Sequence, residues 1–298
     1  MFILDVEAMA RNVSTGIERK QSGGLRMTDL SPVPVRRDYA DGRFGQIHFR
    51  VAVPEFPSVH PPLICFHMSP NSGRIYEVFL GHIGSDRIAV APDTPGFGQS
   101  DSTPQLPSIS DYAAAMGDLI DSLGFDKVDV MGYHTGSETS VELALQRPAL
   151  VRKLVLTSVP IFLEEELQEF RDHYGPTQLT EDGSHLVKKW KGHLFWAGPG
   201  WSKEHVAVHF PDSLLRPDIS HWGHYAAFSY AMADSISKVT QPILALNPHD
   251  DLHKHTLRAA GLIQNGHIED LPDWGHGYLE VRTEEACDLI RGFLNSQV

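Results

Sequence analysis

Residues 128–136 of this 298-residue chain read VDVMGYHTG, and no other stretch says as much about its architecture. A short apolar run, Val128 to Met131, leads into a G-x-H-x-G turn centred on His134, and a helix-like stretch, residues 137–146, follows. The two glycines keep the turn tight, and histidine tolerates a positive-φ backbone better than most non-glycine residues. The pattern predicts a strand, a sharp turn and a helix, with the His134 side chain projecting from the turn.

Apolar runs of strand length recur on both sides of this turn, separated by helix-length segments. They show no polar alternation, which is typical of strands buried on both faces of a sheet. Before them, residues 35–53 alternate in two arms around Asp41-Gly42, which indicates a β-hairpin. This order predicts an α/β fold with a mostly parallel sheet flanked by helices. The other runs are Leu63 to Phe66, Ile88 to Ala91, Leu154 to Thr157, Ile243 to Leu246 and Ile268 to Leu271.

The chain divides into three parts. Residues 1–30 lack periodicity and are expected to form an N-terminal arm, whereas residues 31–160 and 236–298 form the core. Residues 161–235 interrupt the alternation of apolar runs with helix-length segments, and they are rich in Trp, His, Pro and Gly. We expect a helical cap insertion there, above the carboxyl ends of the strands, where open α/β sheets bind ligands. The tryptophans expected at the pocket are Trp190, Trp196 and Trp222.

With 41% hydrophobic and 21% charged residues, the composition is ordinary for a soluble globular enzyme and unlike that of a disordered chain. The formal net charge of −13 argues against nucleic acid or an anionic membrane as the main partner. No window approaches the ~20 apolar residues of a membrane span, and the N-terminus lacks the features of a signal peptide. A cytoplasmic location is the expectation, with Cys65 and Cys287 as buried free thiols. The sequence leaves open whether the protein forms a homodimer.

Further motifs follow the apolar runs in a fixed order. Residues 67–70 read HMSP after the first run, and residues 91–101 read APDTPGFGQSD after the second. Residues 247–251 read NPHDD after the run at Ile243, and residues 273–277 read DWGHG after the last run. Together with the G-x-H-x-G turn, these motifs resemble the α/β-hydrolase superfamily in its single-cap form. The resemblance covers about residues 35 to 296.

The resemblance implies a cofactor-free hydrolase that acts on a small, largely apolar acyl compound. His134 stands where the family carries its nucleophile, commonly a serine. His276 is implied as the general base, and Asp251 as the acid that orients it. We prefer Asp251 to Asp250 because residues 248–251 space like the usual G-x-x-D.

The loop motifs imply the rest of the site. Ser69 and Thr135 are implied to supply the backbone N–H groups of an oxyanion hole. His67, Met68 and Tyr133 are further pocket candidates. Met68 replaces the glycine that commonly follows the loop histidine, so this loop is expected to approach the substrate differently.

Four interpretations of His134 stay open. In the first, its neutral imidazole attacks an acyl carbon, and His276 with Asp251 then activates water. In the second, His134 and His276 act as paired acid and base in a hydrolysis, lyase or isomerisation step. In the third, these two histidines and Asp251 hold a metal ion; we expect no metal, because the family places the acid behind the histidine. In the fourth, the protein binds a small molecule without turnover.

Overall fold

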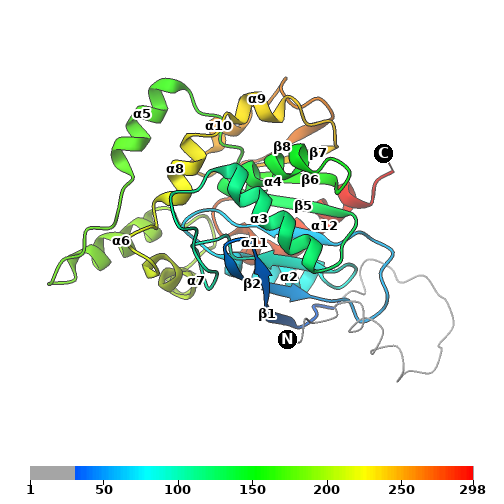
Figure 1. Cartoon of the computed structure of the whole chain (residues 1–298), viewed down its shortest axis with the longest axis horizontal. Helices are drawn as coiled ribbons and strands as arrows, with labels where there is room; N and C mark the ends of the chain where they lie inside the picture. Colours follow the sequence, from blue (N-terminus) through cyan, green and yellow to red (C-terminus); the bar gives the residue numbers. More distant parts are fainter. Residues whose placement is uncertain (1–30, 298) are drawn as a thin grey trace.

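A computed structural model describes residues 31–297, so the predicted N-terminal arm lies outside the described residues. Eight strands form one sheet in the order β1-β2-β4-β3-β5-β6-β7-β8 (Figure 1). Strand β2 pairs antiparallel with β1 and with β4, and the neighbouring pairs from β4 to β8 are parallel. The predicted α/β class with a mostly parallel sheet is confirmed.

The strands fall on the predicted apolar runs, and the hairpin turn is shifted. Gly42 pairs with Gly45, so Arg43-Phe44 forms the turn and the predicted turn residue Asp41 belongs to the first strand. Gly45 has a φ of 115°, which glycine adopts without strain, so the chain reverses beside it. The strands are β1 Val35–Gly42, β2 Gly45–Ala52, β3 Leu63–Phe66, β4 Ala89–Pro92, β5 Val128–Tyr133, β6 Val151–Thr157, β7 Ile243–Pro248 and β8 Gly266–Leu271.

Helices cover both faces of the sheet. In β3, Ile64 and Phe66 pack in the cluster that includes α3 and α4, whereas Leu63 and Cys65 pack in the cluster that includes α2 and α12. Each central strand is therefore buried on both sides, which explains the missing polar alternation. The core helices are η3 Gly73–Tyr76, α2 Glu77–Ile83, α3 Ile109–Ser122, α4 Thr135–Gln146, α10 His253–Leu257, α11 Tyr278–Val281 and α12 Thr283–Asn295.

Residues 161–235, which the sequence predicts to form a cap and which we call the cap segment or cap below, carry the remaining helices. Helices α5 and α6 project away from the sheet (Figure 1) and have no buried residue. Helices α8 and α9 instead pack against α4. Glu280 ties the cap to α11, because its carboxylate lies 2.7 Å from His209 Nε2 and accepts a 2.6 Å hydrogen bond from Trp201 Nε1. The helices are α5 Glu164–His173, α6 Ser184–Phe195, α7 Lys203–His209, η4 Phe210–Leu214, α8 Trp222–Phe228 and α9 Met232–Ile236.

Two expectations from composition concern the thiols and membrane association. Cys65 and Cys287 are both free and buried, as expected. Across residues 31–297, no helix has the length and apolarity that a bilayer crossing requires.

Glycine at position 136 is required by close packing at the turn after β5. A methyl group there would overlap the carbonyl oxygen of Phe66 in the neighbouring β3. Overpacked contacts force the backbone to shift, so we expect Gly136→Ala to lower the free energy of unfolding by about 1–3 kcal/mol. Gly292→Ala on α12 is the matched control, because its methyl group meets no atom and should raise stability by about 0.5–1 kcal/mol. Urea unfolding measures both; equal stabilities would contradict the packing argument.

Candidate active site

His134 lies at the sharp turn between β5 and α4, at the carboxyl edge of the sheet. Its backbone has φ 49° and ψ −115°, the positive-φ conformation predicted for this turn. The His134 amide donates to the carbonyl of Thr157 at the end of β6, over 3.0 Å. A methyl group at Gly132 would overlap the backbone of Gly136. Close backbone packing therefore fixes the turn that carries the imidazole.

Two consecutive aspartates follow β7, and the first of them contacts His134. The side chain of Asp250 is fully buried, and its Oδ2 lies 3.2 Å from His134 Nε2. The same carboxylate accepts hydrogen bonds from Ser158 Oγ at 2.6 Å and from the Leu252 amide at 2.9 Å. The hydroxyl of Tyr133 donates to it over 3.4 Å. Asp250 thus orients the imidazole at the turn, and three neighbours fix Asp250.

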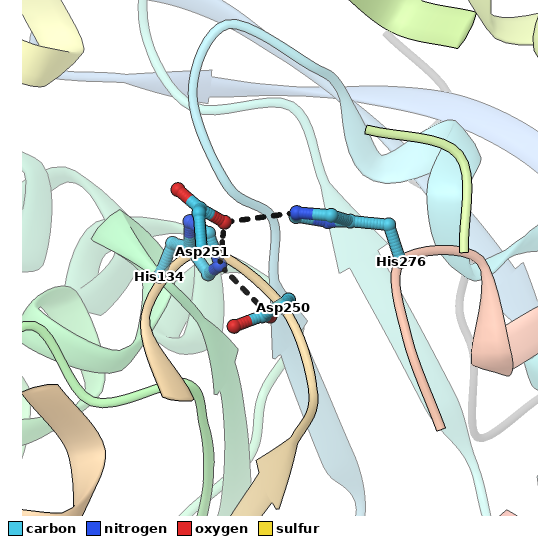
Figure 2. A group of neighbouring side chains, drawn as sticks. All are labelled: His134, Asp250, Asp251 and His276. Atoms are coloured by element: carbon cyan, nitrogen blue, oxygen red, sulfur yellow. Dashed lines mark hydrogen bonds and ion pairs between the residues drawn. The ribbon is translucent and has the colours of Figure 1, made fainter. Parts of the chain in front are cut away.

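The second aspartate contacts the other histidine. His276 lies between β8 and α11, and its Nε2 is 2.9 Å from Asp251 Oδ1. The same Oδ1 is 3.7 Å from His134 Nε2, so this carboxylate stands between the two imidazoles (Figure 2). The two imidazole rings are 5.5 Å apart between centroids. The structure brings together the three residues implied as catalytic, and each histidine has a carboxylate of its own.

These charged groups shift one another's proton affinity. Burial lowers the pKa of His134, but the charges of Asp251 and Asp250 and the hydrogen bond to Asp250 outweigh burial and raise that pKa. Burial raises the pKa of Asp250, yet the hydrogen bond with His134 and its charge bring that pKa below its usual value. Burial likewise opposes ionisation of Asp251, but the charge of His134 and the hydrogen bond with His276 lower its pKa. Near neutral pH both carboxylates are ionised, and protonation of His134 is favoured.

A cavity of about 690 Å³ lies against this cluster, with residues of the core and of the cap in its wall. His134, Asp251 and His276 all line it. The cap adds imidazoles that are neutral near pH 7, because burial lowers the pKa of His193 to about 4 and that of His224 to about 3. Asp172, Lys188 and Lys189 also line the cavity, so its wall carries charges besides those of the cluster. Its size suits a small molecule.

The loop after β3 contributes only part of the pocket expected from it. Met68 and Ser69 line the cavity. His67 does not, because it is buried and both ring nitrogens are engaged: Nε2 accepts from the Thr94 amide at 2.8 Å, and Nδ1 lies 2.9 Å from the Met68 carbonyl. His67 therefore fixes the loop. Tyr133 is buried beside the cluster and does not line the cavity.

The cap tryptophans also differ from expectation. Trp196 lines the cavity, with its ring 6.3 Å from that of His276. Trp190 packs edge-on against Phe210 at 5.2 Å between centroids, and Trp222 begins α8; neither lines the cavity. Trp201, which we did not expect there, does line it. Which aromatic faces the pocket depends on how the cap helices pack.

The two amides implied as oxyanion donors are available. Within residues 31–297, neither the Ser69 nor the Thr135 amide donates a hydrogen bond to a backbone carbonyl outside regular helices and strands. Thr135 is the first residue of α4, where amides have no partner within the helix and the helix dipole favours negative charge. Thr135 directly follows His134 in the chain, and Ser69 lines the same cavity as His134, although Thr135 is not among the residues of that cavity wall.

Ser158 was not among the residues singled out from the sequence. It directly follows β6, its φ is 56°, and its hydroxyl donates to Asp250. The available signal was a polar residue immediately after a buried strand, at the edge where the other site residues lie. Its role is to hold the carboxylate that holds His134.

Comparison with known proteins gives matches along most of the chain. Residues 61–217 match the alpha/beta hydrolase fold family. An uncharacterised protein of Mycobacterium tuberculosis is 38% identical over 140 residues, 45% of this chain and 39% of that protein. Haloalkane dehalogenase 2 of the same organism is 30% identical over 124 residues, 41% of this chain and 42% of that protein. The chain thus spans about two-fifths of the length of these curated relatives. An uncharacterised carboxylesterase of Bacillus subtilis is 24% identical over 307 residues, 96% of this chain and 98% of that protein.

Solved structures show the same fold at low sequence identity. A hydrolase from Pseudomonas aeruginosa has a TM-score of 0.74 and 16% identity, covering 87% of this chain and 98% of that chain. An esterase from a Rhodococcus species has a TM-score of 0.72 and 18% identity, with the same coverage. The family match spans just over half of the 298 residues, and the turn, sheet order and loop motifs agree with it. The chain belongs to the alpha/beta hydrolase fold family.

Proposed function

We propose that the protein hydrolyses small acyl esters, with His276 as general base and His134 as general acid. The observation that carries the proposal is the double pairing, in which His134 faces Asp250 at 3.2 Å and His276 faces Asp251 at 2.9 Å. Family membership and the carboxylesterase and dehalogenase among the relatives support hydrolysis. The adjoining cavity supports a small-molecule substrate.

The contacts of His134 favour acid–base chemistry over direct attack by its ring. Nε2, at the tip of the side chain, faces both Asp250 and Asp251, and the raised pKa favours the protonated ring. An imidazolium has no lone pair with which to attack an acyl carbon. It does donate a proton to a leaving group and stabilise negative charge.

Asp251 fixes the tautomer of neutral His276. Because Nε2–H donates to the carboxylate, the lone pair lies on Nδ1. Nδ1, which lies 3.4 Å from the Tyr133 hydroxyl, takes a proton from water in this scheme, and the water oxygen attacks the acyl carbon. The amides of Ser69 and Thr135 stabilise the oxyanion. As the carbon–oxygen bond breaks, His134 protonates the departing alkoxide, and exchange with solvent returns both histidines to their starting states.

The decisive experiment is a burst-phase assay with a panel of p-nitrophenyl and alkyl esters, quenched early and examined by intact mass. We expect turnover without a mass adduct. An adduct on the wild type that vanishes in His134→Ala would instead establish an acyl-imidazole intermediate. No turnover of any ester, by the wild type and by His134→Ser alike, would contradict hydrolysis.

The paired imidazoles also favour a second candidate, a lyase or isomerase step that removes a proton next to a carbonyl. Such a step needs a base and an acid close together, and the two rings lie 5.5 Å apart. Deuterium exchange at the α-carbon of ketones, in the absence of ester turnover, would favour this candidate. Tight ligand binding with neither reaction would favour a non-catalytic binding protein.

Turnover of an alkyl ester should decline at alkaline pH. The pKa of His134 in the folded protein lies above its ordinary value of about 6.5. The imidazolium, with the stability it confers, is therefore fully present below about pH 6.5 and is lost as pH rises through the raised pKa. A p-nitrophenyl ester should lack this decline, because its leaving group departs without a proton. Steady-state pH profiles test this; the same alkaline limb for both esters would contradict the acid role.

A further inference from the structure

We propose that His134, Asp250, Asp251 and His276 bind one zinc-like divalent cation, and that this cation inhibits the enzyme. Among residues 31–297, this is the group of potential ligands that converges, since one donor atom from each lies within 4.8 Å of all the others. The inhibitory half of the inference rests on the proposed function. The binding half does not.

Three of the six spacings between the donor atoms are close to those around one tetrahedral ion, and the others are at most 4.8 Å. Zinc lies about 2.0–2.2 Å from imidazole nitrogen and carboxylate oxygen, which places tetrahedral ligands about 3.4 Å apart. Asp251 Oδ1 is 2.9 Å from His276 Nε2 and 3.7 Å from His134 Nε2, and His134 Nε2 is 3.2 Å from Asp250 Oδ2. Both imidazoles already direct Nε2 at carboxylates (Figure 2), so a cation between them requires small side-chain shifts.

The donor set selects the kind of cation. Two imidazole nitrogens with two carboxylate oxygens suit zinc and cobalt, whereas magnesium and calcium prefer oxygen ligands alone. The two carboxylates supply two negative charges in a place where the Asp250 side chain is fully buried and that of Asp251 is 30% exposed. Ser158 and the Leu252 amide hold the Asp250 carboxylate in position, as groups behind metal ligands commonly do.

The number of protein ligands argues for inhibition. Catalytic zinc sites keep one of four positions for water or substrate, whereas sites filled by four protein ligands are closed. Here the four side chains complete the tetrahedron. Coordination of the cation through Nε2 displaces the Nε2 proton of His134, so the imidazolium that acts as the acid is lost. Coordination of His276 through Nε2 leaves its remaining proton on Nδ1, so the lone pair that acts as the base is lost as well. The enzyme itself needs no metal in this scheme.

Calorimetric titration of the chelator-treated, full-length protein with Zn²⁺ near neutral pH tests the site. We expect about one tightly bound ion per chain, no comparable binding of Mg²⁺, and an intense visible absorption with Co²⁺ that marks tetrahedral geometry. Saturating Zn²⁺ should lower ester turnover more than tenfold, and EDTA should restore it. Asp251→Asn and His134→Gln should each weaken Zn²⁺ binding about 100-fold or more.

The matched control is His253→Gln. It removes a separate histidine–aspartate contact, 2.9 Å between His253 Nε2 and Asp270 Oδ1, and should leave Zn²⁺ affinity unchanged. Circular dichroism checks that each variant is folded, and the Co²⁺ spectrum of the wild type reports on the site without any variant. Absent binding, or binding that survives both ligand substitutions, would overturn the site. Bound Zn²⁺ with unchanged or faster turnover would overturn inhibition. Because calorimetry needs no substrate, it tests the metal site even if the protein does not hydrolyse esters.

Discussion

His276→Ala is expected to lower kcat for an alkyl ester by about 10²–10⁴-fold, the contribution typical of a positioned general base. The substitution should lower kcat and leave KM nearly unchanged, because the base acts in the transition state of the chemical step and does not contribute to substrate binding. Asp251→Asn should reduce kcat in the same direction, since the 2.9 Å contact to His276 Nε2 then no longer fixes the tautomer. Steady-state kinetics on both variants measure these losses.

Two controls separate a chemical role of His276 from a structural one. Added imidazole should restore part of the activity of His276→Ala, because the removed ring leaves space beside the cavity; a merely structural role would show no such rescue. His253→Ala, outside the cavity, should retain wild-type turnover. If His276→Ala kept activity within about threefold of the wild type, a change worth only ~0.65 kcal/mol, His276 would not be the base.

Most strands of the sheet could be predicted because their burial on both faces is visible in a short stretch of sequence. A strand covered on both faces needs apolar residues at every position, so runs such as Leu63 to Phe66 are visible in the sequence. The hairpin turn was misplaced because Asp41-Gly42 carries a turn signature, yet Gly45, with φ 115°, takes the special conformation. Several glycines close together compete for that position, and the pairing register decides among them.

The site was predictable to the extent that topology determines it. The carboxyl ends of parallel strands meet at one edge of the sheet, so side chains that follow β5, β7 and β8 must converge there. This brings His134, Asp251 and His276 together. Topology does not determine which of two adjacent aspartates faces which histidine, because a rotation of the loop after β7 exchanges them. The pocket tryptophans were less predictable still, since contacts between cap and core place them.

Asp250→Asn is the second substitution with a large expected effect, because it changes charge and leaves shape almost unaltered. Burial, the largest influence on His134, lowers its pKa, and Asp251 and Asp250 reverse that effect. Without the charge of Asp250, we expect the His134 pKa to fall and its alkaline limb to move to lower pH. At neutral pH the acid is then depleted, and kcat for an alkyl ester should fall about 100-fold. Hydrolysis of a p-nitrophenyl ester should change far less.

The stability of this variant should change much less than its activity. Ser158 donates to Oδ2 of Asp250 and the Leu252 amide donates to Oδ1. An amide oxygen at the Oδ2 position still accepts from Ser158, whereas the NH2 group at the Oδ1 position leaves the Leu252 amide without this acceptor. The loss in the free energy of unfolding should not exceed about 1–3 kcal/mol. Asp121→Asn is the matched control, because it removes the charge of an exposed aspartate paired with Arg147 at 2.9 Å. It should change neither the His134 pKa nor turnover.

The measurements that decide this prediction are an NMR titration of the His134 ring and paired pH profiles for the two esters. A lowered His134 pKa with undiminished alkyl-ester turnover would show that the imidazolium is not the acid. An unchanged pKa would show that Asp251 alone keeps the ring charged. Only a joint fall of the pKa and of alkyl-ester turnover fits a histidine whose charge, maintained by Asp250, replaces the serine hydroxyl that the family commonly carries at this turn.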